Sequence, residues 1–331
     1  MLSFRSRADT FCKSDFIIFS VKPGEYRVHK CTWQGSYNLK TQKIAFVTGK
    51  GGTGKSMVAL SMAYHQAVLG KKTLLVELAE SSFFQFLTDK IQLDFAPQEV
   101  KSNLYVSRWD GATCLRDYFL HLVRSETLLK IIFDNPFMKT LVDVGPSLSE
   151  LAIVGKITSG AREIGPQMDF DLIVIDAYAT GHMLALIRAP FGIAEAVKIG
   201  PMATQCRDII KTLRDKEVTS YYIVTIPEEL AITESIELWN ALNLEIGVIP
   251  KFICNKLVMP PITKTELIEL SREPIGEGAS GFIKFILDKV EFQAVQLEKI
   301  KDLAGPVVEI PHFLTAKSTD LVDKMSWYLK I

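Results

Sequence analysis

Short apolar runs alternate with longer amphipathic stretches over most of the chain from residue 43 onward. The runs are rich in β-branched residues, as is typical of strands that are buried on both faces. The intervening stretches carry apolar residues at helical spacing, and the first of them ends at Gly70. The pattern predicts strands at 43–48, 72–78, 103–109, 170–177, 221–226, 251–257 and 306–311, and helices at 55–69, 192–215, 231–243, 280–302 and 317–329.

This alternation predicts an α/β fold with a doubly wound, mostly parallel sheet that helices cover on both faces. The stretch 112–164 breaks the alternation with two helical patterns and no strong strand, so we interpret it as an inserted helical subdomain of a domain spanning 43–331. Residues 258–280 have the composition of a loop. We expect residues 1–42 to form a mobile or loosely attached extension rather than a targeting peptide, because acidic residues interrupt their apolar run.

The composition argues against several classes of protein. Lysine plus arginine equals aspartate plus glutamate at 38 each, so no net field favours a nucleic-acid partner. Apolar runs are too short for a membrane-spanning helix, so we do not expect an integral membrane protein. The cysteines form no C-x-x-C pair, which argues against a zinc knuckle and favours a reducing, cytoplasmic compartment. They are Cys12, Cys31, Cys114, Cys206 and Cys254.

Residues 49–56 read GKGGTGKS and match the phosphate-loop pattern G-x-x-x-x-G-K-[ST] between a predicted strand and a predicted helix. Glycines let consecutive backbone N–H groups turn around phosphate oxygens, and the following helix adds its positive end. Lys55 can reach the β and γ phosphates, and the Ser56 hydroxyl can ligate Mg²⁺. The alternative is an ordinary βα turn. The predicted nucleotide-binding residues are Gly49, Lys50, Gly51, Gly52, Thr53, Gly54, Lys55 and Ser56.

Lys50 is a second cation that a single phosphate site does not need. Two like charges repel around an empty loop, so we expect Lys50 to point away from Lys55 without nucleotide; it could simply be a solvated loop residue. K-G-G-x-G-K-[ST] is, however, similar to the deviant phosphate loop of the ATPase branch that includes arsenical-pump, tail-anchored-protein-targeting, Min, Par and nitrogenase iron-protein groups. The extra lysine of that branch crosses a dimer interface to the partner's ATP. The resemblance therefore implies a nucleotide-bridged homodimer in which Lys50 acts in trans, as an arginine finger does.

The sequence DAYATGHM, which begins at Asp176, resembles the D-T-A-P-T-G-H-T second switch of the arsenical-pump and tail-anchored-targeting ATPases. An acid at the end of a buried strand beside a phosphate loop suits an outer-shell partner of Mg²⁺, so Asp176 takes that role. The backbone N–H of Gly181 could sense the γ phosphate. Thr180 and His182 are expected to be switch residues without direct chemistry.

Two further segments resemble this family. Residues 222–238 are similar to its segment in which a strand ends in a proline, an acid and then a helix. Residues 252–257, FICNKL, are similar to the strand whose asparagine contacts adenine, so the resemblance makes Asn255 the candidate base contact. The resemblance covers roughly 43–331 and implies ATP and Mg²⁺ as cofactors.

The first switch departs from the family. Ala79 stands where an ungapped comparison places the acid that orients the attacking water. Glu80, one residue later, is the first candidate for that role, and Glu77, two residues earlier, is the second. A displacement of about 1 Å in such a group can reduce the rate a hundredfold, so hydrolysis is less firmly implied than binding.

The partner is not readable from the sequence. The family's cysteine cluster for arsenite has only Cys114 as a counterpart in the helical insertion, and the zinc-binding C-x-x-C of the targeting branch is absent. The apolar residues of the insertion either line a groove for a protein partner or apolar client, or form ordinary core. They are Phe119, Leu120, Leu122, Leu128, Leu129, Ile131, Ile132, Phe133 and Met138.

The sequence thus favours a Mg²⁺-dependent, dimeric ATP hydrolase that acts as a nucleotide-driven switch coupled to a partner or client. One alternative is a nucleotide-sensing adaptor with little or no hydrolysis, because Ala79 replaces the acid. Another is a surface-bound positioning ATPase of the Min or Par type. That class predicts a basic amphipathic terminal helix, whereas residues 318–331 are amphipathic but not strongly basic.

Overall fold

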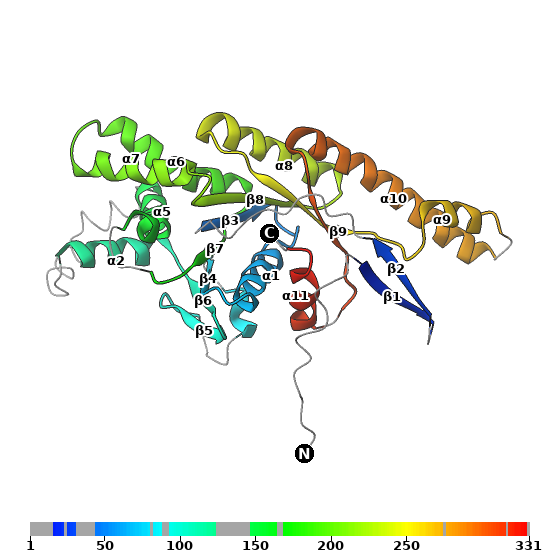
Figure 1. The fold of residues 1–331 in the computed structure, drawn as a ribbon. Coiled ribbons are helices and arrows are strands. Elements are labelled where there is room, and N and C mark those ends of the chain that lie inside the picture. The colour runs from blue at the N-terminus through cyan, green and yellow to red at the C-terminus, as the bar shows by residue number, and fades with distance from the viewer. Residues whose placement is uncertain are drawn as a thin grey trace, which may run out of the picture.

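The computed structural model contains an eight-stranded sheet in the order β10-β9-β8-β3-β7-β4-β6-β5 (Figure 1). Neighbouring strands are parallel except for the β5–β6 pair. The strands are β3 (Ile44–Gly49), β4 (Thr73–Glu77), β5 (Gln98–Lys101), β6 (Leu104–Arg108), β7 (Leu172–Asp176), β8 (Thr219–Thr225), β9 (Lys251–Leu257) and β10 (Val308–Pro311). The structure describes residues 16–22, 25–30, 44–79, 82–87, 93–123, 146–163, 168–273, 276–315 and 317–329.

Helices cover both faces of this sheet (Figure 1). One face packs against α1 (Lys55–Val68) and α11 (Ser318–Ser326). The other face packs against a layer that contains α5 (Pro146–Arg162), α6 (Thr180–Ala196), α7 (Pro201–Arg214), α8 (Glu229–Ala241) and α10 (Glu277–Ala304). The predicted α/β fold with a mostly parallel sheet is confirmed. The remaining described α-helices are α2 (Gly111–Val123) and α9 (Lys264–Leu270).

The central strand β3 is buried along its whole length. Because side chains alternate between the faces of a strand, Phe46 packs in one core cluster while Ala45 and Val47 pack in the other. The Phe46 ring stacks on Tyr221 of β8 with centroids 5.3 Å apart. Each large side chain buried in this way stabilises the fold by about 1.5–3 kcal/mol. This packing holds the carboxyl end of β3, where the phosphate loop begins, at the middle of the sheet edge.

Several predicted elements differ from the observed ones. The predicted helix 192–215 is wrong, because two helices occupy this region. Helix α6 already begins at Thr180, and a non-helical segment that includes Gly200, whose φ is +105°, separates it from α7. The predicted loop 258–280 contains α9, which begins with a capping box between Thr263 and Glu266. Strand β5 was not predicted, since it is short, polar and only half buried.

The two segments that the sequence sets apart are described only in part. Strands β1 (Phe16–Lys22) and β2 (Glu25–Lys30) form an antiparallel hairpin within the expected extension. Helices α2 and α5 lie in the predicted helical insertion, and α5 packs against both α6 and α7. Residues 124–145 lie outside the described residues, so the client groove stays a prediction. None of the described helices is long and apolar enough to span a membrane.

Candidate nucleotide-binding site

The phosphate loop leaves the carboxyl end of β3 and enters α1, between the ends of β7 and β8. At Gly49, an added Cβ would lie 2.1 Å from the backbone oxygen of Val224, so only glycine fits. Gly52 and Gly54 have φ values of +85° and +88°, in the left-handed region that glycine adopts without strain. Gly51, by contrast, has open space around it and no positive φ. Three of the four glycines are therefore required by the shape of the loop.

Side chains from within the loop and from β9 hold the loop in this shape. The fully buried Thr53 hydroxyl donates a hydrogen bond to the Lys50 carbonyl at 2.9 Å. The Asn255 side-chain amide donates to the Thr53 carbonyl at 2.9 Å, and the Lys256 ammonium donates to the Gly52 carbonyl at 2.7 Å. Two consecutive residues of β9 therefore hold two consecutive carbonyls of the loop. Since the C=O and N–H of a trans peptide point in opposite directions, this directs the N–H that follows Thr53 away from Asn255.

Asn255 also accepts a hydrogen bond from the Lys256 backbone N–H at 2.9 Å. This contact accompanies a left-handed backbone at Lys256, with φ +58°, which is uncommon for a residue with a Cβ. Asn255 is thus engaged with the phosphate loop. Its predicted contact with the base stays a prediction.

Asp176 ends β7 next to the loop and is 5% exposed. Burial raises the pKa of its carboxyl to about 6, although the charge of Lys55 and a hydrogen bond from Ser56 act in the opposite direction. The charge of Glu77, its register partner on β4, also raises this pKa. The Oδ1 atom of Asp176 is buried and has no hydrogen-bond partner. An unpartnered anionic oxygen in this position is suited to a cation or to a water that a cation holds.

This donor set fits Mg²⁺ that arrives with a nucleotide. The hydroxyl of Ser56 and the carboxylate of Asp176 are hard oxygen donors, which Mg²⁺ prefers. Over the part of the chain that the structure describes, no group of three or more His, Cys, Asp or Glu side chains is arranged to hold a metal ion. Mg²⁺ is commonly bound by one or two protein oxygens together with substrate phosphates and waters, and Ser56 and Asp176 can supply such oxygens.

Glu77 is buried and already engaged at the first switch. One of its oxygens accepts a hydrogen bond from the Ser82 hydroxyl at 2.6 Å, and the other accepts from the Phe83 backbone N–H at 2.5 Å. These bonds hold the start of the 3₁₀ turn η2 (Phe84–Leu87) beside the end of β4. Glu77 therefore has a clear structural task, and its role in positioning water stays a prediction. Glu80 lies outside the described residues.

The two lysines of the loop face different acidic groups. Lys55 acts electrostatically on Asp176, which ends β7. Lys50 forms an ion pair with Glu234 of α8, with its Nζ 2.6 Å from Oε1, and about a third of each side chain is exposed. Strands β7 and β8 flank β3 on opposite sides, and α8 follows β8. The second cation of the loop is thus paired within its own chain.

The second switch places another helix N-terminus at the same edge of the sheet. The Thr48 hydroxyl donates to the Tyr178 carbonyl at 2.8 Å, which ties the end of β3 to the segment after β7. Helix α6 begins at Thr180 without a side-chain cap, so Gly181 lies in a first turn whose N–H groups lack intrahelical partners. The His182 ring packs edge-on against the Tyr178 ring, with the two centroids 6.1 Å apart. The predicted roles of Gly181, Thr180 and His182 stay predictions.

Sequence reasoning assigned no role to Glu234 or Lys256. Glu234 lies in the segment 222–238, for which only a resemblance was available, and Lys256 directly follows Asn255. Their targets in the phosphate loop are 184 and 204 positions away along the chain. The one available signal was that both residues lie within these matched segments. That position does not say which residues their side chains contact.

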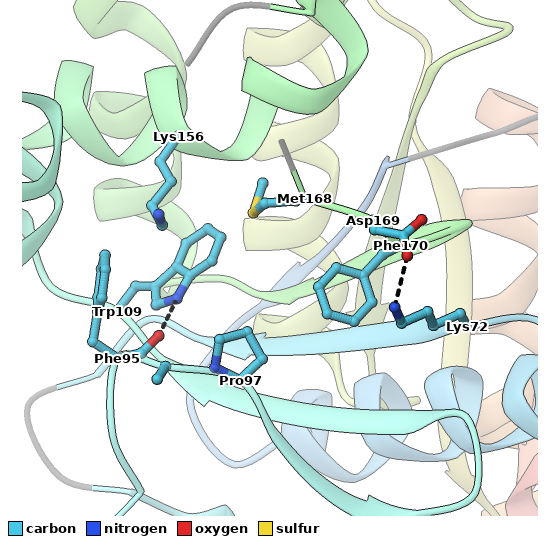
Figure 2. Close-up of a pocket in the computed structure, with 9 residues that line it drawn as sticks. Lys72, Phe95, Pro97, Trp109, Lys156, Met168, Asp169 and Phe170 are labelled. Carbon is cyan, nitrogen blue, oxygen red and sulfur yellow. Dashed lines mark hydrogen bonds and ion pairs between the residues drawn. The ribbon is translucent and has the colours of Figure 1, made fainter. Parts of the chain in front are cut away.

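A cavity lined in part by Lys156 of α5 lies outside the phosphate loop (Figure 2). Its volume is about 330 Å³, and none of its lining residues belongs to the predicted nucleotide-binding set. The Lys156 ammonium lies 4.5 Å from the Phe95 ring centroid and 5.1 Å from that of Trp109, and it is also ion-paired with Asp117 at 2.7 Å. The lining residues are Lys72, Phe95, Ala96, Pro97, Trp109, Lys156, Met168, Asp169 and Phe170.

The fold and the loop define a nucleotide-binding protein of the P-loop class. Residues 42–200 match the family model described as anion-transporting ATPase. Over this stretch the chain is similar to the ArsA-like ATPases, in agreement with the resemblance of its phosphate loop and second switch.

Curated relatives agree with this assignment. The chain is 28% identical over 213 residues to the ATPase BagA of Mycobacterium tuberculosis, an alignment that covers 60% of each chain. It is 24% identical over 282 residues to the ATPase GET3B of Arabidopsis thaliana, covering 70% of this chain and 68% of that protein. It is also 24% identical over 235 residues to the arsenical pump-driving ATPase of Escherichia coli, covering 65% of this chain and 39% of the relative.

Proposed function

We propose that the chain binds Mg²⁺·ATP at residues 49–56 and hydrolyses it. The observation that supports this proposal is a glycine-constrained loop, held by Asn255, beside Asp176, whose buried Oδ1 lacks a partner. The match of residues 42–200 to the anion-transporting ATPase model supports the same activity.

In this proposal the loop amides and the N-terminus of α1 bind the phosphates, while Lys55 contacts the β and γ phosphates. Ser56 would ligate Mg²⁺, and Asp176 would hold it through the outer shell. When bound, the metal neutralises charge on the phosphates. Gly181 reports the presence of the γ phosphate through its backbone N–H, and Asn255 lies on the strand that contacts the base.

Hydrolysis also needs a group that orients the attacking water, and Ala79 cannot serve. Both oxygens of Glu77 accept hydrogen bonds from the loop that follows, which leaves Glu80 as the first candidate. A second candidate function is therefore a nucleotide-sensing adaptor with little turnover, and the substitution at Ala79 is the observation that favours it.

The proposed cycle involves two copies of the chain. Mg²⁺·ATP closes a homodimer in which Lys50 of each copy reaches the nucleotide of the other, and hydrolysis releases the two copies. A protein partner or apolar client then senses this motion at the helical insertion. The half-buried pairing of Lys50 supports the proposal, because about a third of its side chain is accessible from outside.

Steady-state phosphate release and calorimetry test the proposal on the full chain, using Lys55→Ala, Glu80→Ala and the exposed Lys284→Ala as a matched control on α10. We expect the unaltered chain and Lys284→Ala to bind Mg²⁺·ATP and turn it over equally. Lys55→Ala should lose about a hundredfold in turnover, as for other preorganised cationic or hydrogen-bonding groups.

Turnover of the unaltered chain no faster than that of Lys55→Ala, with nucleotide binding retained, would instead support the adaptor. If calorimetry detects no uptake of adenine or guanine nucleotide in the presence of Mg²⁺, the proposed function is wrong.

A further inference from the structure

The ion pair between Lys50 and Glu234 joins the phosphate loop to α8. Glu234 lies in the second turn of α8, and the preceding strand β8 pairs with β3 up to Gly49 itself. The pair is short, at 2.6 Å, and each side chain is about one third exposed. Its position therefore combines a defined geometry with access from outside.

Lys50 can exchange its partner in a pair that is this exposed. Partly exposed ion pairs contribute little net free energy, because solvent screens the attraction and both side chains lose freedom. Nucleotide phosphates carry more negative charge than one carboxylate, so they can displace Glu234 as the partner of Lys50. In the structure, the ammonium of Lys50 rests against Glu234.

We infer that Glu234 is a positioning residue. It holds the ammonium of Lys50 against its own chain until the nucleotide of a second copy replaces Glu234 as the partner of Lys50. The inference rests on the proposed function, since it requires Lys50 to act across a dimer. In the chain without a dimer partner, the pair keeps the ammonium of Lys50 on α8 and away from the phosphate site that Lys55 serves. In the ATP-bound dimer the pair is broken, and Glu234 recaptures Lys50 when the copies separate.

Removing the charge of Glu234 should therefore favour the dimer. We expect Glu234→Gln to lower the dissociation constant of the dimer by about 1.5- to 5-fold, measured by sedimentation velocity with Mg²⁺ and a non-hydrolysable ATP analogue. The same substitution made together with Lys50→Met should produce no further change relative to Lys50→Met alone. Binding of the analogue to the dilute monomer should be unaltered.

Glu237→Gln is the matched control, because Glu237 is an exposed residue one turn further along α8 and the substitution removes the same charge. A second measurement compares low and high salt. The difference between the unaltered chain and Glu234→Gln should shrink at high salt, where ions screen the pair.

A weaker dimer in Glu234→Gln would overturn the inference, because Glu234 would then guide Lys50 within the dimer. An effect that persists without Lys50, or that Glu237→Gln reproduces, would also overturn it. If the unaltered chain binds the analogue and stays monomeric, the inference fails while the ATP site stands. If it binds no nucleotide, the proposed function fails as well.

Discussion

The side-chain amide of Asn255 donates a hydrogen bond to the backbone carbonyl of Thr53, 202 positions earlier in the chain, at 2.9 Å. Asn255 is 5% exposed, so this carbonyl would lose its partner in a buried place if the amide were removed. Together with the Lys256 contact to Gly52, the bond shapes the phosphate loop before any ligand binds. Part of the nucleotide affinity should therefore reside in β9.

We expect Asn255→Ala to lower the free energy of unfolding by about 1–3 kcal/mol, the cost of leaving a buried group unsatisfied. Mg²⁺·ATP affinity should fall as well, because the loop must then be ordered by the ligand. Chemical denaturation and calorimetry measure the two effects, with the exposed Asn240→Ala on α8 as control. A loss of affinity without any loss of stability would point instead to a direct contact with the base.

Gly49 and Gly51 should respond differently to the same substitution. In Gly49→Ala the new Cβ would meet the Val224 backbone oxygen at 2.1 Å, so β3 and β8 must separate. We expect a destabilisation of about 1–3 kcal/mol or more and a loss of nucleotide binding. At Gly51 an added Cβ would meet open space, so Gly51→Ala should change the free energies of unfolding and of nucleotide binding by no more than about 0.5 kcal/mol. Thermal unfolding with and without Mg²⁺·ATP checks the pair, and equal effects at both positions would contradict the observed loop.

Asp176 should make the stability of the nucleotide-free chain depend on pH. Burial raises the pKa of its carboxyl from an ordinary 3.8 to about 6, so between these values the folded chain binds more protons than the unfolded chain. The free energy of unfolding therefore falls as the pH rises through this window, and above pH 6 the ionised group costs about 3 kcal/mol. Asp176→Asn removes the titrating group and should stabilise the nucleotide-free chain at pH 7.

Urea denaturation from pH 4 to pH 8 measures this difference. The advantage of Asp176→Asn should be largest above pH 6 and should shrink toward pH 4, where the natural carboxyl is protonated. Added Mg²⁺·ATP should stabilise the unaltered chain more than the variant, because the variant lacks the anionic oxygen. A difference that is constant across the pH range would show that Asp176 does not titrate as described.

Glu77 and Glu80 can be separated by their amide variants. Glu77→Gln should change turnover only about two- to threefold if the carboxylate serves mainly to hold Ser82 and Phe83. Glu80→Gln should reduce turnover by about a hundredfold or more if Glu80 orients the attacking water. Ser82→Ala is the matched control, since it removes one bond to Glu77 and leaves the carboxylate in place. Phosphate release at saturating Mg²⁺·ATP gives the ranking, and a larger loss in Glu77→Gln would reverse the assignment.

Local physics made much of the fold predictable. Apolar β-branched runs such as the one that forms β3 are typical of strands buried on both faces, and glycines 49, 52 and 54 suit a tight turn before a helix. Elements with weak local signals were missed or misplaced. Strand β5 is short and polar, and the start of α6 has no side-chain cap to mark it.

The sequence by itself determined the parallel sheet, the phosphate loop and the acid that ends β7, because short-range periodicity and the backbone freedom of glycine are properties of neighbouring residues. Only the tertiary structure decided which partners complete the site. Glu234 and Lys256 lie far along the chain from the loop and carry no local mark of their task. They meet the loop because β8 and β9 pair on one side of β3 in the order and register of the sheet, a long-range arrangement that no local pattern encodes.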